Sequence, residues 1–297
     1  MIICALIVTY NRLDKLKKCL DSYDKQKRKP DKIIVVDNNS NKETKIFLNE
    51  WSLVKKEYEK IILTLDKNYG GSGGFYYGMR KALEIGFDWL WIADDDAYPD
   101  DDALFNLENV ILSTNYQAIC GVVYNSNGID LNHRRIIIEK KYSVKETCAE
   151  KENYDKKAFN IDLFSFVGTA MSKAVIEECG FPKKEYFIWF DDTEYSYRVR
   201  KKFDIICCSN IKIYHDSVEK NDGISWKNYY GERNGLDMYK NHYTKKQFFS
   251  KIIRYKLKII KNYFLNRKYY FILKDAYYDY KINKLGVSNK YKPGIKV

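Results

Sequence analysis

The sequence predicts an α/β fold in which a mostly parallel sheet is flanked by helices, followed by a basic, helical C-terminal extension. Short apolar runs rich in β-branched residues alternate with segments of helical periodicity. Each run ends in a polar or glycine-rich cluster, as expected where parallel strands end at a ligand crevice. Positive charge is concentrated at the end of the chain: residues 240–297 contain 16 Lys and Arg against two acidic residues, whereas residues 1–239 contain 36 against 38.

The composition is that of a folded protein. The 297 residues are 45% hydrophobic, 31% charged and 16% aromatic, which provides enough apolar surface for a large core and excludes general disorder. No apolar run reaches the length of about 18 residues that a transmembrane helix needs. The N-terminal residues lack the basic segment of a signal peptide. The seven cysteines are scattered without C-x-x-C spacing, which argues against a disulfide framework or a structural zinc site and fits a reducing cytosol.

The first 96 residues read as alternating strands and helices. Residues 2–8 form a buried strand, and Asn11 can cap the helix that follows, in which leucines recur at helical spacing. The expected elements are, in order, strand 2–8, helix 13–23, strand 33–36, helix 46–51, strand 61–65, a helix that ends near residue 84, and strand 89–93. The polar clusters lie at 9–12, 37–40, 68–74 and 94–96. Because they follow strands of one parallel sheet, we expect all four to converge on one crevice.

The second half is less regular. Residues 124–154 are polar and predict a hairpin or a mobile loop over the site. The expected elements after them are an apolar segment 164–170, helix 173–179 stopped by Gly180, an aromatic segment 186–190, a helix that begins with acids at 191, and apolar segments 205–208 and 211–214. We divide the chain into a domain of residues 1–239 and a basic helical region of residues 240–297.

Three aspartates, Asp94, Asp95 and Asp96, directly follow a predicted strand. Residues i and i+2 of such a segment lie on a common side, so two carboxylates can bind a divalent cation that also bridges a diphosphate. The simpler interpretation is an acidic turn, since Asp is common in loops. Packing of like charges at a strand end favours the metal site.

A glycine-rich stretch at 68–75 allows close approach of the backbone to a ligand and leads into a helix N-terminus that favours anions. It lacks both the Walker A pattern and G-x-G-x-x-G, so a flexible turn remains the alternative. A second candidate region is the acidic start of a helix at Asp191 and Asp192, beside aromatic residues; one of these acids caps the helix dipole, and the other could act as a general base.

Single residues give weaker signals. His215, at a strand end, is either a structural hydrogen-bonding residue or a metal ligand. Trp189 and Trp226 could stack on a sugar face, although most tryptophans fill gaps in the core or the surface.

The motifs together resemble a known family. ALIVTYNR (5–12), VVDNNS (35–40), NYGGSGGF (68–75), DDDAYP (94–99), WFDDTEYSYR (189–198) and YH (214–215) occur in this order. This ordered set, over residues 2–235, is similar to the family 2 glycosyltransferases with a GT-A fold, especially the bacterial galactofuranosyl- and rhamnosyltransferase branch. The chain is much shorter than the polymerising mycobacterial galactofuranosyltransferases, which favours addition of a single sugar.

The resemblance implies a role for each motif residue. The residues placed around the nucleotide-sugar donor are Thr9, Asn11, Arg12, Asp37, Asn39, Asn68, Gly70, Gly71, Gly74 and Asp95. Asp94 and Asp96 match the D-x-D metal site, and His215 matches the third metal ligand, for Mg²⁺ or Mn²⁺. Asp192 matches the catalytic base, and Asp191 positions the acceptor or the base. Tyr230, Arg233 and Asn234 resemble a segment near the donor or the acceptor.

These roles define the expected reaction. One base without an enzyme nucleophile predicts a single displacement with inversion at the anomeric carbon. The expected donor is UDP-galactofuranose, with dTDP-rhamnose second and pyranosyl UDP-sugars third. The expected acceptor is a hydroxyl of a lipid-linked bacterial surface glycan. A nucleotidyltransferase, which shares metal-bound aspartates, is the alternative enzyme.

The basic C-terminal region has three interpretations. Its charge and tyrosines could bind nucleic acid, but no nucleic-acid motif is present and no such partner is expected. An apolar stripe at helical spacing runs through Phe249, Ile253, Leu257, Ile260 and Phe264, interleaved with Lys251, Arg254, Lys258 and Lys261. The stripe could pack on the domain or lie on an anionic membrane. We expect a cytoplasmic enzyme that is peripheral on the inner face of the cell membrane.

Overall fold

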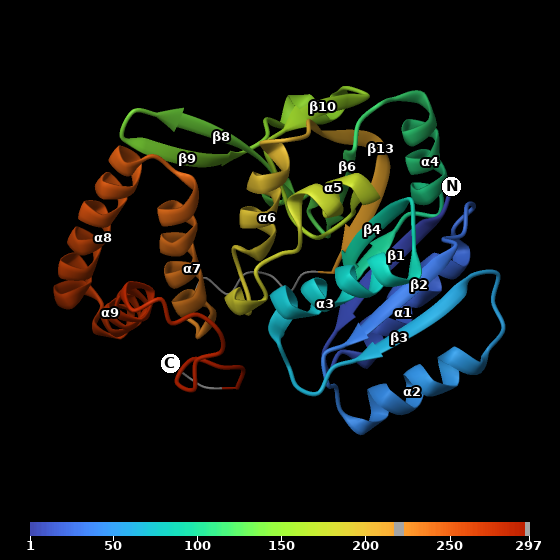
Figure 1. Cartoon of the computed structure of the whole chain (residues 1–297), viewed down its shortest axis with the longest axis horizontal. Helices are drawn as coiled ribbons and strands as arrows, with labels where there is room; N and C mark the ends of the chain where they lie inside the picture. Colours follow the sequence, from blue (N-terminus) through green and yellow to red (C-terminus); the bar gives the residue numbers. More distant parts are fainter. Residues whose placement is uncertain (217–222, 295–297) are drawn as a thin grey trace.

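The computed structural model describes residues 1–216 and 223–294, which form a ten-stranded sheet, a three-stranded sheet and flanking helices (Figure 1). The strands are β1 Ile3–Thr9, β2 Lys32–Asp37, β3 Glu59–Thr64, β4 Trp89–Asp94, β5 Ala97–Pro99, β6 Ala118–Asn125, β7 Gly128–Ile129, β8 Arg134–Lys140, β9 Ser143–Cys148, β10 Ala158–Ile161, β11 Leu163–Phe164, β12 Thr169–Ser172 and β13 Ile205–His215. The helices are α1 Leu13–Lys25, α2 Lys42–Leu53, α3 Gly70–Ile85, α4 Ala103–Ser113, α5 Lys173–Cys179, α6 Asp191–Arg200, α7 Lys227–His242, α8 Lys245–Leu265 and α9 Arg267–Lys281. Short 3₁₀ helices span Leu131–His133, Lys151–Asp155 and Lys184–Tyr186.

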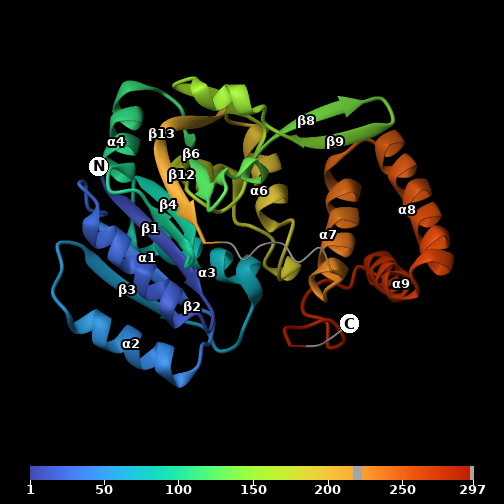
Figure 2. The same cartoon turned by 180° about the vertical axis from the view of Figure 1, so that it is seen from behind.

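The large sheet has the strand order β10-β13-β6-β12-β4-β1-β2-β3. The neighbouring strands β4, β1, β2 and β3 are all parallel. Strand β12 lies between β4 and β6 and is antiparallel to both. Helices α1, α2 and α4 contribute to the core on one face of the sheet, and α3, α5 and α6 contribute to the core on the other. Figures 1 and 2 show this layering from the two sides. The predicted α/β class, with a mostly parallel sheet between helical layers and a helical C-terminal region, is confirmed.

The continuous apolar run of β1 is explained by its central position, where every residue of the strand is buried. Leu6 and Val8 belong to the core beneath α3, and Ala5 and Ile7 belong to the core beneath α1. A strand covered on both faces needs apolar side chains at successive positions, because these alternate between the two faces.

The glycine-rich stretch is helical rather than a flexible turn. Helix α3 begins at Gly70, and the later glycines of the stretch lie within it. A Cβ on Gly74 would lie 2.4 Å from Val8 Cγ1, and a Cβ on Gly78 would lie 2.4 Å from Leu6 Cδ1. These glycines therefore let α3 pack tightly on β1.

Several expected elements are merged or shifted. Residues 124–154 contain the β8–β9 hairpin, as one of the two interpretations predicted, and the two apolar segments before His215 form the single strand β13. Asn11 does not cap α1: Arg12 is the residue before the helix, and Asn11 Oδ1 instead accepts a hydrogen bond from the Asn41 backbone N–H at 2.7 Å. The proposed division after residue 239 falls in the last turn of α7.

Helices α7, α8 and α9 pack together beside the sheet domain (Figures 1 and 2). Their shared core contains Leu236, Tyr255, Leu273 and Tyr280. Within the described residues, no helix is long and apolar enough to cross a membrane.

Candidate active site

The four polar clusters meet at the carboxyl ends of β1, β2 and β4. Thr9 Oγ1 donates a hydrogen bond to Asp95 Oδ2 at 2.6 Å, which joins the ends of β1 and β4. The amide side chain of Asn38, after β2, donates to the carbonyl of Gly70 at 2.7 Å, and its Oδ1 accepts from the Tyr69 backbone N–H at 2.9 Å. The predicted convergence of the polar clusters at the strand ends is therefore observed.

The charges of Asp95 and Asp96 are balanced by two cationic side chains from the β1–α1 segment. Arg12 Nη2 lies 2.5 Å from Asp95 Oδ1, and Arg12 Nη1 lies 2.6 Å from Asp96 Oδ2. Lys15 Nζ lies 3.3 Å from the same oxygen of Asp96. His215 approaches from β13, with Nε2 at 3.4 Å from Asp96 Oδ1. The D-x-D motif and His215 are thus brought together as predicted.

The three aspartates differ in their affinity for protons. Burial, together with the charge of Asp96, raises the pKa of Asp94 to about 7. Burial raises the pKa of Asp95 to about 6, although Arg12 opposes the shift. For Asp96, burial is outweighed by the hydrogen bond from His215 and the charge of Arg12, which hold its pKa well below the usual range. The strand end carries excess negative potential that a cation would relieve.

His215 has one ring nitrogen engaged and one free. Its Nδ1 is buried and has no hydrogen-bond partner among the described residues. His133, which precedes β8, stacks edge-on against it with ring centroids 5.1 Å apart. His133 is held by Ser165 Oγ at 2.6 Å from its Nδ1 and by Asp130 at 3.5 Å from its Nε2. The imidazole of His215 is therefore fixed by a neighbouring ring while keeping an unused nitrogen.

Asp37, at the end of β2, presents an unused acceptor. It is fully buried, and its Oδ1 accepts from the Ser40 backbone N–H at 2.7 Å. Its Oδ2 has no partner among the described residues. Asn39 lies in the same turn with a positive φ of 61°, and its side chain bonds to the Asp66 carbonyl and to Lys45.

The glycine segment separates into open and packed positions. Asn68 Oδ1 accepts from the Gly70 backbone N–H at 2.7 Å at the start of α3. A Cβ on Gly71 would meet no atom within 4 Å, so its backbone is approachable. Gly70 is packed against the Phe187 carbonyl, and Gly74 is packed against Val8. Gly74 therefore lets α3 pack closely on β1, and its donor-lining role stays a prediction.

The predicted acid pair lies at the start of α6. Asp191 is 8% exposed, and burial together with the charge of Asp192 raises its pKa to about 8. The charge of Asp94 also contributes to this shift. The Phe187 carbonyl, just before the acid pair, accepts from the Ser72 backbone N–H at 3.2 Å at the start of α3. Asp192 Oδ1 accepts from the Thr193 backbone N–H at 2.6 Å, and Thr193 Oγ1 is bound by Arg135 Nη2 at 2.8 Å.

The segment before the acid pair is strained and is held from α7. Phe187, Trp189 and Phe190 have positive φ angles of 66°, 63° and 69°. The amide nitrogen of the buried Asn234 donates to the carbonyls of Tyr186, Ile188 and Trp189 at 3.0, 3.1 and 2.9 Å. The side chain of Arg233 donates to Asn234 Oδ1 and to the Gly286 carbonyl.

Two tryptophans were considered as sugar-stacking residues. Trp189 is 42% exposed and lies against Gly231, where a Cβ would meet its ring at 2.7 Å. Its exposed face remains available beside the acid pair. Trp226 packs with Phe187 and Tyr230 at ring-centroid distances of 6.2 and 5.8 Å. It therefore fills a gap in the core, as most tryptophans do.

Several basic residues of the site were not predicted from the sequence. Lys15 lies one turn into α1, and Lys227 begins α7, where burial and the nearby Arg12 lower its pKa. Arg135, on β8, bridges Thr193 and Glu146. Isolated basic residues outside any motif carry no distinguishing signal in the sequence, because pairing with the acid clusters depends on long-range contacts.

Across residues 1–216 and 223–294, no three or more His, Cys, Asp or Glu residues are arranged closely enough to hold a metal ion. Asp94, Asp96 and His215 are the right chemical set, but Arg12 and Lys15 contact Asp96. The metal assignment therefore stays a prediction.

Known proteins resemble this chain in sequence and in structure. The sequence model of the family described as "Glycosyl transferase family 2" matches residues 4–180. The galactofuranosyltransferase GlfT1 of Mycolicibacterium smegmatis is 37% identical over 105 residues, which cover 35% of this chain and 33% of the relative. The match therefore spans about a third of that relative's length.

Among solved structures, S. aureus TarS 1–349 in complex with UDP superposes with a TM-score of 0.59 at 15% identity, covering 83% of this chain and 68% of the TarS 1–349 chain. GalNAc-T7 with UDP, GalNAc and Mn²⁺ gives a TM-score of 0.64 at 15% identity, covering 83% of this chain and 49% of that protein. These likenesses show the expected GT-A fold.

Proposed function

The chain belongs to glycosyl transferase family 2, and we propose that it is a divalent-cation-dependent, inverting glycosyltransferase. The observation that carries the proposal is a series of contacts between the D-x-D motif after β4 and the segment before the acid pair of α6. Thr9 binds Asp95, Asn38 after β2 binds the Gly70 carbonyl, and the Ser72 backbone N–H donates to the Phe187 carbonyl at 3.2 Å. The D-x-D motif could hold a cation that neutralises a leaving diphosphate, and the acid pair could take a proton from an acceptor hydroxyl.

The donor nucleotide would occupy the ends of β1 and β2. The free Oδ2 of Asp37 is a buried acceptor that suits an N–H of a base or a hydroxyl of a ribose. Thr9 and Arg12 hold Asp95 at the opposite side of this space. The open backbone at Gly71, in the first turn of α3, offers N–H groups to an anion.

Asp94, Asp96 and His215 would hold a cation such as Mg²⁺ or Mn²⁺. The raised pKa of Asp94 and the unpartnered Nδ1 of His215 support this fit. Arg12 and Lys15 would have to release Asp96 Oδ2 or share it. When bound, the cation supplies charge neutralisation to the leaving diphosphate. The structural neighbour GalNAc-T7, solved with UDP and Mn²⁺, supports this chemistry.

Asp192 is proposed as the general base, and Asp191 as the residue that positions the acceptor or the base. Asp192 would accept the proton of the attacking hydroxyl while the glycosidic bond to the diphosphate breaks on the opposite face of the sugar. A direct attack without an enzyme nucleophile inverts the anomeric configuration. Trp189 would cover one face of the sugar.

UDP-galactofuranose is the preferred donor in this proposal, and dTDP-rhamnose is the second choice. The similarity to GlfT1 supports the first, and the neighbours bound to UDP support a uridine nucleotide. The proposed acceptor is a hydroxyl of a lipid-linked glycan, reached from the cytoplasmic side by a peripheral enzyme.

A donor-hydrolysis screen tests the proposal. The chain is incubated with UDP-galactofuranose, dTDP-rhamnose and pyranosyl UDP-sugars, each with Mg²⁺, Mn²⁺ or EDTA, and released UDP or dTDP is measured. We expect cation-dependent release from one sugar nucleotide. Consumption of nucleoside triphosphates with release of pyrophosphate would instead indicate a nucleotidyltransferase. Retention in the transferred sugar would exclude the single displacement.

A further inference from the structure

Helix α8 has two apolar faces, and only one of them is covered. The inner face, with Phe248, Ile252, Tyr255 and Ile259, packs against the other C-terminal helices. The outer stripe predicted from the sequence points away from the protein: Phe249, Leu257 and Phe264 are 67%, 59% and 76% exposed. Ile253 and Ile260 of the same stripe are also exposed. At about 1.5 Å per residue, the stripe is roughly 22 Å long.

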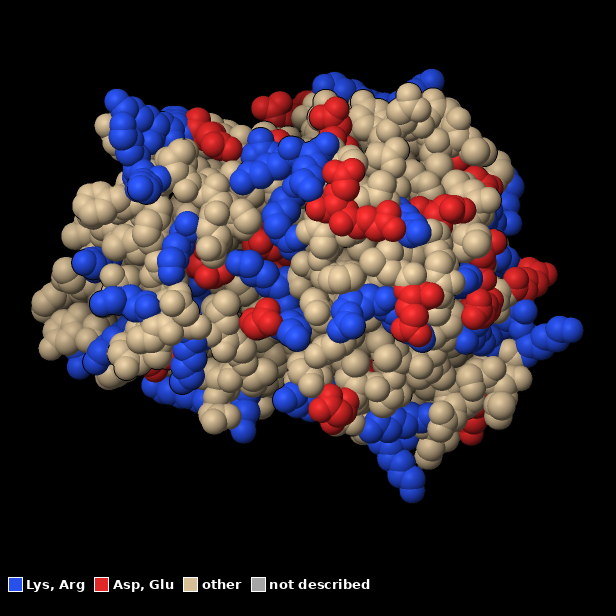
Figure 3. Space-filling view, in the orientation of Figure 1, with Lys and Arg blue, Asp and Glu red and all other residues tan. Residues whose placement is uncertain are grey.

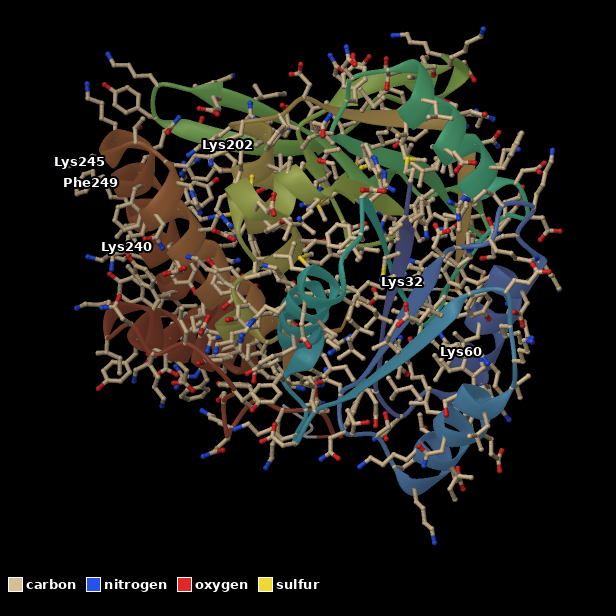
Figure 4. The ribbon with its side chains drawn as sticks, turned by 45° about the vertical axis from the view of Figure 1, so that its right-hand side comes forward. Lys32, Lys60, Lys202, Lys240, Lys245 and Phe249 are labelled. Atoms are coloured by element: carbon tan, nitrogen blue, oxygen red, sulfur yellow. The ribbon has the colours of Figure 1, made fainter. Side chains whose placement is uncertain are left out.

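The charge around this stripe has one sign. Helix α8 contains seven Lys and Arg and no acidic residue. Lys245, Lys246, Lys256 and Lys261 are exposed beside the stripe, and none of the four has an acidic partner within the described residues. Figure 3 shows Lys and Arg interspersed with uncharged residues over α8 and α9 at the left of the view. In Figure 4, Lys245 and Phe249 lie at the outer edge of α8, far from Lys32 and Lys60.

Two of the basic residues expected at this surface face inwards instead. Lys258 Nζ lies 2.6 Å from Glu232 on α7, and Lys251 Nζ lies over the ring of Tyr239 at 4.6 Å. These two contacts hold α8 against α7, whereas Arg254 and Lys261 remain exposed. The outward charge is therefore carried by a different set of lysines from the one predicted.

The tip of the β8–β9 hairpin extends this surface. Gln247 Nε2 donates to the Lys140 carbonyl at 3.0 Å, and Arg254 Nη2 donates to the Tyr142 carbonyl at 3.3 Å. Between the tip and α8 lies a hollow of about 570 Å³, lined by Tyr142, Lys245, Lys246, Phe249 and Arg254 among others. Its lining combines aromatic and cationic groups, which suits an anionic headgroup attached to acyl chains.

We propose that the outer face of α8, with the hairpin tip, docks on an anionic lipid bilayer. Charge complementarity and the exposed apolar stripe together select this partner, because the stripe would enter the acyl boundary while the lysines reach phosphates. A second copy docking through the same face would bring the five exposed cationic residues of α8 against their own counterparts. A nucleic acid would satisfy the lysines but leave the aliphatic residues of the stripe exposed.

The hairpin relates this surface to the proposed active site. Its base carries Arg135, which binds Thr193 next to Asp192, and its tip carries Tyr142. At about 3.3 Å per residue, the seven residue steps from Arg135 to Tyr142 span at most about 23 Å. Resting on the proposed function, the inference places the acceptor hydroxyl no more than about that far from the lipid surface, within reach of a lipid-linked glycan.

Vesicle sedimentation tests the proposal with the full chain. Vesicles of phosphatidylcholine with phosphatidylglycerol are compared with vesicles of phosphatidylcholine alone. We expect binding to the anionic vesicles that is released as salt rises from about 0.1 M to about 1 M, because exposed charges are screened. The variant with Lys245, Lys246, Lys256 and Lys261 changed to Glu should bind about a thousandfold more weakly or worse. A matched control reverses Lys25, Lys42, Lys55 and Lys157, which are exposed elsewhere, and should bind normally.

A second variant, with Leu257, Ile260 and Phe264 changed to Ser, should also lose binding while keeping the circular dichroism of the parent. Equal binding to both vesicle types, equal loss in the control, or no binding by the parent would overturn the proposal. Two further results would overturn it: a dimer of the parent that the serine variant no longer forms, or binding of RNA that anionic vesicles do not displace. Donor hydrolysis is measured in the same samples: its absence in a parent that binds vesicles would reject the proposed function and leave the docking surface intact.

Discussion

The side-chain amide of Asn234 on α7 donates a hydrogen bond to the main-chain carbonyl of Trp189 at 2.9 Å. The same nitrogen binds the carbonyls of Tyr186 and Ile188, so one buried group holds a segment with three positive φ angles. That segment ends at Asp191, where the proposed acid pair begins. Helix α7 also packs against α9, so the C-terminal region supports the site as well as the surface.

Asn234→Ala should destabilise the fold. It leaves three carbonyls of the strained segment without this donor, and we expect the free energy of unfolding to fall by about 2–4 kcal/mol. Urea denaturation measures the change. Asn241→Ala on the same helix, where the side chain is exposed and binds only the Asp237 carbonyl, should cost less than about 0.5 kcal/mol. Equal losses in the two variants would show that the segment does not depend on Asn234.

Asp94→Ala or Asp96→Ala should abolish cation-dependent transfer without unfolding the protein, because each removes a proposed ligand from the crevice. Transfer is measured against Mn²⁺ and Mg²⁺ concentration. Asp101→Ala, at an exposed position after β5, serves as the control. His215→Ala should retain transfer but require more cation, since one neutral ligand is lost. An unchanged cation titration would assign His215 a structural role.

Asp192→Asn should keep donor binding and lose transfer by about 10²–10⁴-fold, the usual contribution of a general base. Donor affinity is measured by calorimetry with UDP, and transfer is measured by product formation. If Asp191→Asn is inactive and Asp192→Asn is active, the general base is Asp191 and not Asp192. The raised pKa of Asp191 gives that outcome a physical basis, because a carboxyl with a pKa of about 8 is a stronger base.

Gly74→Ala should destabilise the protein by about 1–3 kcal/mol, because its Cβ would lie 2.4 Å from Val8 Cγ1 and force α3 away from β1. Gly71→Ala is the matched variant in the same helix. Its Cβ meets no atom within 4 Å, so alanine should be neutral or stabilise by up to about 1 kcal/mol. Thermal unfolding distinguishes the two. A smaller loss at Gly74 than at Gly71 would contradict the packing role.

Local patterns were sufficient for strands β1 to β4 of the sheet domain, whereas helix α4 and strand β6 were not predicted. The apolar run of β1 predicted a buried strand, because a strand covered on both faces must be apolar at every position. The same reasoning located the ends of β2 and β4, and therefore the crevice that contains Asp37 and Asp95. Helix α3 was harder, because glycines that permit close packing resemble glycines that form turns until the partner strand is known.

Contacts between distant segments could not be predicted. The pairing of Asp96 with Lys15 and the support of Trp189 by Asn234 join residues far apart in the chain. The outer stripe of α8 was identified, but both faces of that helix carry apolar residues, so periodicity alone did not decide which one packs. Lys258 points towards the protein because it pairs with Glu232 on α7, and helical spacing within α8 cannot predict a partner on another helix.

Stability should fall as pH rises from about 4 to about 8, through the titration of Asp191. Its pKa in the folded protein is raised to about 8, so the folded state holds this proton more tightly than the unfolded state does. The resulting stabilisation is complete at low pH and is lost as pH passes the folded pKa.

Asp191→Asn cannot ionise, so its advantage in stability over the parent should grow by about 1–3 kcal/mol between pH 5 and pH 9. Urea unfolding in EDTA measures both proteins. Asn241→Ala, which is exposed and removes no titratable group, is a control whose difference from the parent stays constant with pH. Parallel curves for Asp191→Asn and the parent would mean that Asp191 is charged in the folded protein throughout this range.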